Sequence, residues 1–314
     1  LALAQDGTVN TLSSTMGSCP FPTRYTSLTA LTARWRRGPL TATGTVVGTY
    51  ITERVREGTA PEDIKRLSPS LSVSVQPWKE EMLFLRGMYK STFRTPTFND
   101  LYYDRLGNRS LRPERANEYD LGVTWSGKFC QAMDYFSVTA DGYFNEVTDK
   151  IVAFPTTYAW KMANFGKVHV TGVDFTMATA FSLPRGINVS LSAAYTWQRA
   201  VDLTEKEAKN YKEQLPYTPE HSGNMAVTVK SPWVTLGYSL VGVGKRYYLS
   251  QNIPVNEIEG YVEQTVTLGH ELSLRGCRLG LRCELVNLAD KQYDVIKYYP
   301  MPGRSWRVVA NVKF

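Results

Sequence analysis

The sequence predicts an all-β protein and, more narrowly, part of a transmembrane antiparallel β-barrel. Short alternating runs of Val, Thr and Ser accompany 19 Tyr, 12 Phe and 7 Trp, and these residue types favour strands. Most strand-like segments span 10 or more residues. Strands of soluble domains usually have about 5 to 6 residues, whereas membrane-crossing strands need about 9 to 11. The connectors alternate between short and long, which is typical of outer-membrane barrels.

About 13 strands are expected, running back to back along the chain, and a helix is expected only at residues 204–214 (TEKEAKNYKEQ). We expect residues 1–24 to form an extracellular loop region. No stretch approaches the roughly 18 consecutive apolar residues of a membrane-spanning helix, which excludes a helical membrane protein. The strands are predicted near residues 25–37, 40–55, 66–78, 82–94, 115–127, 133–154, 158–183, 186–200, 221–231, 232–250, 258–275, 277–290 and 305–314.

The connectors predict the direction of each strand. Short connectors such as RRGP, SGKFCQA and LRG alternate with longer polar or aromatic segments. Outer-membrane barrels have short periplasmic turns and longer extracellular loops. The final strand is therefore expected to run toward the periplasm. The longer segments are residues 56–65, 95–114, 201–220, 251–257 and 291–304, with a weaker member near 155–157.

Period-two alternation assigns two faces to the strands. Leu191 lies on a face with other apolar residues, while Ser190 lies on the opposite, polar face. A soluble sandwich would show the same alternation, but strand length and connector rhythm favour the barrel. The apolar set must then face lipid, because Arg or Lys on that face at the bilayer midplane costs about 2 to 4 kcal/mol. The residues expected to face a wet lumen are Arg86, Lys90, Arg94, Asp120, Asp174, Lys230, Arg278, Arg282, Glu284 and Arg307.

The stretch from Phe93 to Trp125 reads FRTPTFNDLYYDRLGNRSLRPERANEYDLGVTW. It resembles the signature of TonB-dependent outer-membrane receptors, in which F-R-x-P-T, G-N-x-x-L-x-P-E and E-x-x-L-G elements follow one another. Further similar elements occur in the same order as in the family: YFNEVTDKIVAF, NFGKVHVTGVDF, PYTPEHSGN and NLADKQYDV, and then a terminal strand ending in Phe314. The resemblance covers about residues 25–314, and the cobalamin and ferric siderophore receptor group is the most similar.

The resemblance implies a barrel of about 22 strands closed by an N-terminal plug. It implies active uptake energised by the TonB complex through that plug. Residues 25–314 would be the C-terminal portion of the barrel, embedded in outer-membrane lipid, and the plug domain is expected to be absent from this chain. The implied ligand is a bulky, scarce metal chelate such as cobalamin or a ferric siderophore, and a surface lipoprotein is a candidate further partner. A haem receptor of the same family is an alternative, although no His lies between Pro96 and Leu111.

Candidate ligand contacts are aromatic and basic residues of the longer loops. Flat amphipathic rings cover a large ligand at low entropy cost. The alternative for each ring is a place in the aromatic girdle at the membrane interface. The lumen charges are expected to pack against the plug rather than to contact a polar substrate, and the F-R-T-P residues are expected to be structural. The candidate loop residues are Tyr102, Tyr103, Arg105, Tyr158, Trp160, Tyr247, Tyr248, Tyr298 and Tyr299.

Other functional classes find little support in the sequence. The net charge of +7 is dispersed, so no nucleic-acid partner is expected. The four Cys lack CxxC spacing, so neither a zinc site nor another metal site is predicted. No set of nucleophile, base and acid is apparent, and we expect neither catalysis nor a cofactor. A passive porin or adhesive barrel, and more remotely a soluble all-β binding module, are the rival interpretations.

Overall fold

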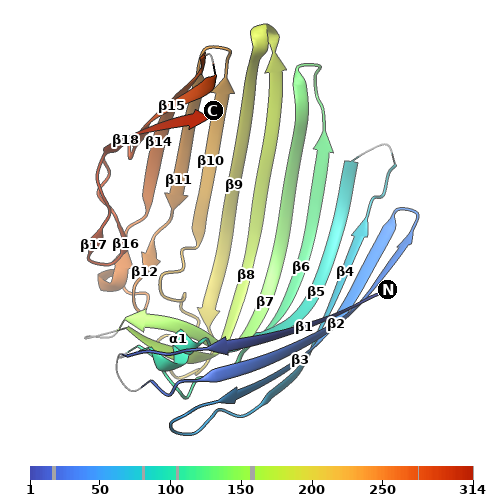
Figure 1. Ribbon diagram of the computed structural model, residues 1–314, viewed down its shortest axis with the longest axis vertical. Helices are drawn as coiled ribbons and strands as arrows, with labels where there is room; N and C mark the ends of the chain where they lie inside the picture. Colours follow the sequence, from blue (N-terminus) through green and yellow to red (C-terminus); the bar gives the residue numbers. More distant parts are fainter. Residues whose placement is uncertain (16–18, 80–81, 104–105, 156–159, 275, 314) are drawn as a thin grey trace.

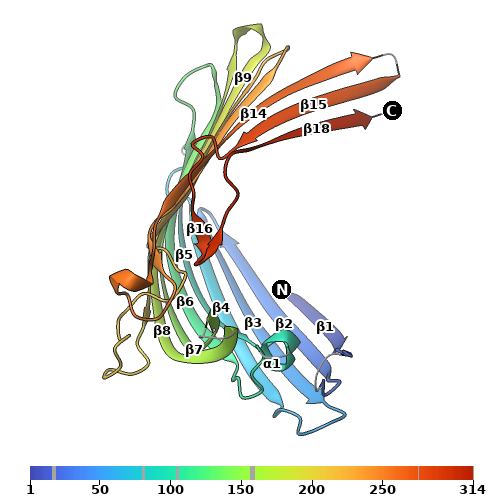
Figure 2. The ribbon, with the colours of Figure 1, turned by 90° about the vertical axis from the view of Figure 1, so that its left-hand side faces the viewer.

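The computed structural model describes residues 1–15, 19–79, 82–103, 106–155, 160–274 and 276–313. They form one curved antiparallel sheet of 14 strands in which every strand pairs with its neighbours along the chain (Figure 1). Figure 2 shows the sheet from its side, open and with one concave face. The strands are β1 (Ala2–Thr11), β2 (Thr23–Arg37), β3 (Leu40–Arg54), β4 (Ile64–Val75), β5 (Met82–Arg94), β6 (Glu114–Gly127), β7 (Met133–Pro155), β8 (Trp160–Leu183), β9 (Ile187–Asp202), β10 (His221–Lys230), β11 (Thr235–Val243), β14 (Tyr261–Leu274), β15 (Cys277–Val286) and β18 (Ser305–Lys313).

Several short elements lie in the connections. The helix α1 follows β5, and two-stranded ladders join β12 to β13 and β16 to β17. No helix among the described residues has the length and hydropathy needed to span a membrane. The bounds of these elements are α1 (Phe98–Tyr102), η1 (Pro184–Gly186), β12 (Arg246–Tyr247), η2 (Pro254–Asn256), β13 (Glu257–Ile258), β16 (Asp294–Ile296) and β17 (Tyr299–Pro300).

The all-β fold class is confirmed, and each of the 13 predicted strands has a counterpart in the sheet of 14. The expectation of a loop over residues 1–24 is wrong for residues 2–11, which form β1 and pair with β2 along their whole length. The alternation in this segment is weak because Gln5 and Gly7 share a face with Leu3. The segment forms a strand because it pairs with β2, where Leu3 lies opposite Leu31.

The predicted helix over residues 204–214 is also wrong, because the segment forms a series of turns. The side chain of Asp202 accepts hydrogen bonds from the backbone N–H of Thr204 (2.9 Å) and from the amide of Asn210 (2.5 Å). The N–H of Lys212 donates to the carbonyl of Asp202 at 2.7 Å. Side-chain bonds of this kind compete with helical hydrogen bonds and favour turns.

The connectors separate to opposite ends of the sheet, as their lengths predict. The tight turns, such as residues 38–39 and 184–186, lie at one end, which we call the turn end (Figure 1). The longer connections, including residues 55–63, 95–113 and 203–220, lie at the other end, the loop end. The weaker loop near 155–157 falls largely on residues 156–159, outside the described residues. The last strand, β18, ends at the turn end, as predicted.

The register places all ten predicted lumen residues on one face of the sheet. One row of direct partners runs from Arg86 through Gly122, Asp141 and Asp174 to Thr196. A second row joins Lys230 to Arg282 through β11 and β14. Arg94 of this polar face binds Asp100 of α1, and α1 lies on the concave side of the sheet (Figure 2). The polar face is therefore the concave face.

The opposite, convex face presents large apolar side chains that nothing covers within the described chain. Leu71 and Leu268 are each 50% exposed, and Leu121 is 75% exposed. Among the described residues, buried apolar side chains gather in two small clusters, both near the loop end: Leu101 with Leu111, Ile151 and Met162, and Val147 with Val168, Ala200 and Leu215. An apolar face of this extent is unfavourable in water and is stabilised in hydrocarbon.

We predict that Leu191→Arg impairs assembly into the membrane, whereas Ser190→Arg does not. Leu191 pairs with Val227 on the convex face, and Ser190 pairs with Thr228 on the concave face. The Leu191 substitution should cost about 2 to 4 kcal/mol near the bilayer midplane. Heat-modifiable mobility of the barrel in outer-membrane fractions measures assembly. Normal assembly of Leu191→Arg together with failure of Ser190→Arg would show that the two faces are assigned backwards.

Candidate functional site

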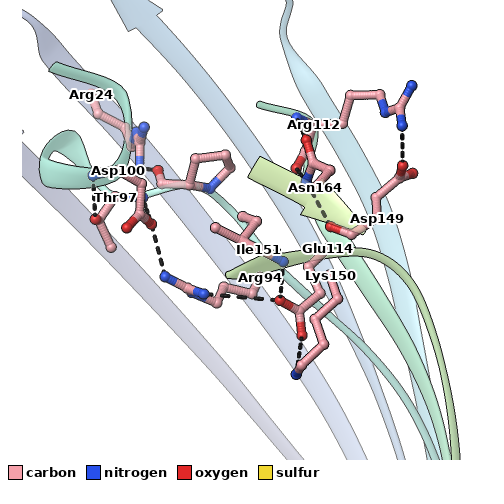
Figure 3. Close-up of polar contacts among 11 residues, drawn as sticks. Arg24, Arg94, Thr97, Asp100, Arg112, Glu114, Asp149, Lys150, Ile151 and Asn164 are labelled. Carbon is pink, nitrogen blue, oxygen red and sulfur yellow. Dashed lines mark hydrogen bonds and ion pairs between the residues drawn. The ribbon is translucent and has the colours of Figure 1, made fainter. Parts of the chain in front are cut away.

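At the loop end, the connection after β5 folds over the concave face and is fixed there by its own first residues (Figure 3). Thr97 caps α1, and its hydroxyl accepts a hydrogen bond from the N–H of Asp100 at 3.1 Å. The carboxylate of Asp100 in turn accepts the N–H of Thr97 at 2.9 Å. This reciprocal pair satisfies two backbone donors that a helix start leaves free. The helix is too short to be stable alone, so its position depends on these bonds and on its packing.

Arg94 links this loop to three strands. Its guanidinium donates to the carboxylate of Asp100 at 2.7 Å and lies 3.9 Å from that of Glu114. Glu114, the first residue of β6, also accepts the backbone N–H of Ile151 at 2.9 Å and lies 3.7 Å from the ammonium of Lys150. Arg94 of the F-R-T-P element and Glu114 of the following G-N-x-x-L-x-P-E element therefore join β5, α1, β6 and β7 in one polar network (Figure 3).

Two residues from the N-terminal part of the sheet complete this network. Arg24 of β2 donates to the carbonyl of Pro96 at 2.8 Å and forms an ion pair with Glu53 of β3 at 2.8 Å. The hydroxyl of Tyr102 donates to Glu53 at 2.6 Å. Partial burial, and then this bond to Glu53, raise the pKa of the Tyr102 hydroxyl well above its usual range. Tyr102 thus serves to hold the loop, although sequence analysis placed it among the ligand contacts.

A second set of contacts closes the far side of the same loop. The Asn164 side chain accepts the N–H of Arg112 at 2.9 Å and donates to the carbonyls of Arg112 and Asp149 at 3.1 and 2.6 Å. The guanidinium of Arg112 forms an ion pair with Asp149. Asn108 donates to the carbonyl of Met162 at 3.0 Å. The motif residues Asn108 and Asn164 therefore have anchoring roles.

Aromatic side chains from three loops and the start of β8 gather at another part of the loop end. We call Trp160, Tyr217, Tyr248 and Tyr298 the aromatic cluster. The Trp160 and Tyr217 rings lie 5.9 Å apart, and the Tyr248 and Tyr298 rings 6.3 Å apart. The ammonium of Lys297 lies 5.8 Å from both the Tyr248 and the Tyr298 ring centres. Burial raises the pKa of Tyr217, which indicates a partly dehydrated environment.

Buried contacts hold the loops of the aromatic cluster together. Arg246 is 4% exposed and donates to the carbonyls of Asp294 and Val295 at 2.6 and 3.0 Å. Burial lowers the pKa of its guanidinium. The N–H of Tyr217 donates to the carbonyl of Tyr247 at 2.7 Å. The chain segments around residues 217, 247 and 295 are therefore held together by bonds to backbone groups, which fixes the positions of these segments relative to one another.

The predicted ligand residues have different surroundings. Trp160, Tyr248 and Tyr298 meet in the aromatic cluster, and Tyr247 contributes its backbone to it. Tyr103 and Tyr299 are 58% and 69% exposed. Arg105 and Tyr158 lie outside the described residues. Sequence analysis missed Arg24, Glu53, Tyr217, Arg246 and Lys297, because their roles depend on partners that are distant along the chain.

The charges of the concave wall bind mainly to one another. Arg86 reaches Asp141 at 2.6 Å by crossing Gly122, where a Cβ atom would lie 1.9 Å from the Asp141 carboxylate. Glu284 forms ion pairs with both Arg282 (2.9 Å) and Arg307. Asp174 accepts the hydroxyl of Thr196 at 2.7 Å, and Lys90 lies 4.0 Å from Glu118. Asp120, Lys230 and Arg278 form no ion pair within the described chain.

Comparison with known proteins identifies a family and a fold. Residues 5–287 match the sequence model of the family described as TonB dependent receptor-like, beta-barrel. The chain is 25% identical over 228 residues to the vitamin B12 transporter BtuB of Photobacterium profundum, a match that covers 71% of this chain and 34% of that protein. It is 23% identical over 240 residues to BtuB of Vibrio vulnificus, covering 71% of this chain and 33% of the relative. The chain thus spans about a third of the length of the curated relatives that it matches.

Solved structures of low sequence identity share the fold. The unliganded ferric citrate transporter FecA superposes with a TM-score of 0.71 at 16% identity, covering 99% of this chain and 50% of that one. The copper transporter OprC superposes with a TM-score of 0.68 at 15% identity, covering 93% of this chain and 48% of that one.

We predict that Asp100→Ala releases the loop after β5 without preventing barrel assembly. The substitution leaves the N-cap Thr97 in place but removes the carboxylate that accepts the N–H of Thr97, and with it a charge-assisted bond to Arg94 worth about 1.5 to 3 kcal/mol. Limited proteolysis of intact cells should then show faster cleavage within residues 98–110. Asn99→Ala, at an exposed position of the same helix, is the matched control. Equal cleavage of the two variants would contradict the anchoring role of Asp100.

Proposed function

Because this chain belongs to the TonB-dependent receptor β-barrel family, we propose that it forms part of a receptor that imports a bulky metal chelate. It is an outer-membrane protein whose strands cross the bilayer repeatedly. The convex apolar face meets lipid, and the concave polar face lines a water-filled bore. The loop end is the extracellular side, because long connections occupy that side in bacterial barrels.

The aromatic cluster is the observation that supports ligand binding most directly. Its rings come from the start of β8 and from three loops that buried contacts hold together, so they are positioned before a ligand arrives. A preorganised site loses less entropy on binding. Tyr and Trp rings offer broad apolar faces with polar edges, and Lys297 adds a positive charge. This combination suits a large, partly aromatic or anionic chelate.

Energy coupling would come from the TonB complex through a plug domain enclosed by the barrel. The concave wall offers such a domain charges of both signs. Asp120, Lys230 and Arg278 form no ion pair among the residues that the structure describes, so they are free to bind a docked domain. Asp141 and Asp174 are direct cross-strand partners, and like charges at such positions are destabilising unless cations compensate them. Basic side chains of a plug would supply that compensation beside Arg86.

Two ligand classes are supported by the relatives. The two curated relatives are named as vitamin B12 transporters, which favours cobalamin. Structural neighbours include a ferric citrate transporter and a ferric preacinetobactin receptor, which favours a ferric chelate. Cobalamin, ferric citrate and ferric preacinetobactin each hold a metal in an organic ligand. The copper transporter OprC, another structural neighbour, is named for the metal alone. A surface lipoprotein that covers the loops is a further candidate partner.

Uptake by intact cells tests the proposed function. The gene is expressed in a strain that lacks its own receptors, and accumulation of labelled cyanocobalamin, ferric citrate and a neutral ferric trihydroxamate is measured. We expect accumulation of at least one ligand, and its loss when tonB is deleted. Accumulation that persists without TonB would support a passive porin. Absence of accumulation and binding for all three ligands would contradict the proposal.

Replacing both Tyr248 and Tyr298 by Ala should lower uptake of the accepted ligand about 10-fold or more. Each aromatic stacking contact is worth about 0.5 to 1.5 kcal/mol, so the loss of two weakens binding by up to about 3 kcal/mol, and about 1.4 kcal/mol already corresponds to 10-fold. Trp233→Ala is the control, because Trp233 is 69% exposed and belongs to a turn-end connector. Equal uptake by the two variants would remove the aromatic cluster from the binding site.

A further inference from the structure

Aromatic side chains mark the two ends of the apolar band on the convex face. At the turn end, the rings of Trp125, Phe129 and Phe136 lie 5.2 to 5.6 Å from one another. Toward the loop end, the rings of Tyr89 and Tyr119 lie 5.2 Å apart. Outer-membrane barrels carry girdles of aromatic residues at both membrane interfaces. The polar side chains that lie beyond Tyr119 on this face are therefore at the level of the lipid head groups.

Arg115 lies beyond the girdle at the loop end. It is on the same face of β6 as Trp125, ten residues away, because side chains alternate along a strand. Ten residues correspond to about 33 Å along a strand, or to about 25 Å of height when the strand is tilted by about 35 to 45°. The apolar band of outer-membrane barrels is also about 25 Å tall. Arg115 thus lies at the outer surface of the bilayer, where a basic side chain costs little on the lipid-facing side.

The strand register brings three hydrogen-bond donors together at this position. Arg115 pairs with Thr148 of β7, and Thr148 pairs with Lys167 of β8. Direct cross-strand partners lie on one face, with Cβ atoms about 4.5 to 5.5 Å apart. A guanidinium, a hydroxyl and an ammonium group therefore stand side by side on the convex face. We call Arg115, Thr148 and Lys167 the basic row.

Positive charge is in excess around the basic row. Lys167 forms an ion pair at 2.5 Å with Glu146, which lies on the same face of β7. Arg115 is exposed, and so is Arg199 of β9, which pairs with Thr171 of β8 on this face. Neither arginine forms an ion pair or a side-chain hydrogen bond with any residue that the structure describes. Strand geometry puts the Cα atoms of Lys167 and Arg199 about 14 Å apart.

From this placement we infer that the basic row binds a phosphate group of a glycolipid in the outer leaflet of the membrane. A guanidinium binds phosphate through two parallel hydrogen bonds, and an ammonium group binds it as a point charge. The Thr148 hydroxyl provides a further donor between them. This site lies on the outer wall and goes beyond the proposed uptake function, although it rests on the same placement of the loop end outside the cell.

The surroundings of the basic row favour a phosphorylated glycolipid over other anions. Leu121, on the same face of β6 as Arg115, is 75% exposed, so acyl chains of a bound lipid would cover it. A soluble anion gains no such apolar contact. A phosphate monoester on a sugar carries a charge of about −1.5 to −2, more than the diester of a phospholipid. A disaccharide with a phosphate at each end can also reach from the basic row to Arg199.

Binding of lipids to the full-length protein in neutral detergent tests the inference. The probes are bis-phosphorylated lipid A, the same lipid without its phosphates, and phosphatidylglycerol. We expect lipid A to bind at least about 10-fold more tightly than either of the others, and to bind more weakly as salt is added.

Substitutions in and beside the basic row distinguish a binding role from a structural one. Arg115→Gln and Lys167→Gln should each weaken lipid A binding about 10-fold, because each removes a charge-assisted bond. Glu146→Gln should instead tighten binding, because it releases Lys167 from its ion pair. Arg37→Gln is the control, since it removes the charge of an exposed arginine at the turn end, on the other surface of the membrane.

Three results would overturn the inference. The first is equal binding of lipid A with and without its phosphates. The second is lipid A binding that Arg115→Gln and Lys167→Gln leave unchanged in variants that fold normally. The third is binding of phosphatidylglycerol as tight as that of lipid A, which would make the basic row a site for any anionic lipid.

Discussion

The need to satisfy every backbone hydrogen bond inside a bilayer governs this structure. Hydrocarbon offers no partner for an exposed N–H or C=O group, so strands can cross it only within a continuous ladder. The 14 long strands form such a ladder, each paired with its sequence neighbours. Strand pairing then fixes the side chains, because a residue and its partner in the next strand point to the same side. One row of register partners can therefore carry Arg86, Asp141 and Asp174 on the concave face, while Leu71, Leu121 and Leu268 point to the convex face.

The same constraint explains why irregular structure is concentrated at the loop end. Within the bilayer, the backbone of each strand is held in the hydrogen-bonded ladder, and each side chain faces either lipid or the water-filled bore. Beyond it, the chain can form irregular structure, provided that its polar groups find partners. The loop after β5 meets this condition through Arg24, Glu53, Arg94, Asp100 and Glu114, whose bonds fix it above the bore. The loops of the aromatic cluster meet the same condition separately, through the bonds of Arg246 to the carbonyls of Asp294 and Val295 and of the Tyr217 N–H to the carbonyl of Tyr247.

Sequence patterns predicted the strands well because long strands with period-two alternation give a strong signal. They failed where a segment depends on its partner. The segment that forms β1 has weak alternation, and its pairing with Leu31 and its neighbours in β2 is not visible in the segment itself. Residues 204–214 have helix-forming composition, but the carboxylate of Asp202 directs them into turns. The resemblance to a receptor family marked Arg94, Asn108 and Asn164 as notable, and the structure shows that they anchor a loop. Arg24, Glu53 and Arg246 carry no local signal, since their partners lie 29 to 72 residues away for the first two and 48 or 49 for the third.

The whole arrangement requires that the convex face meets hydrocarbon and the concave face meets water. Spin labels attached to single cysteines introduced in turn at residues 188 to 193 of β9, in a variant without the native cysteines, measure this directly in reconstituted membranes. We expect collisions with oxygen to be highest at positions 189, 191 and 193, and collisions with a water-soluble nickel chelate to be highest at positions 188, 190 and 192. The opposite alternation, or no alternation with period two, would contradict the account.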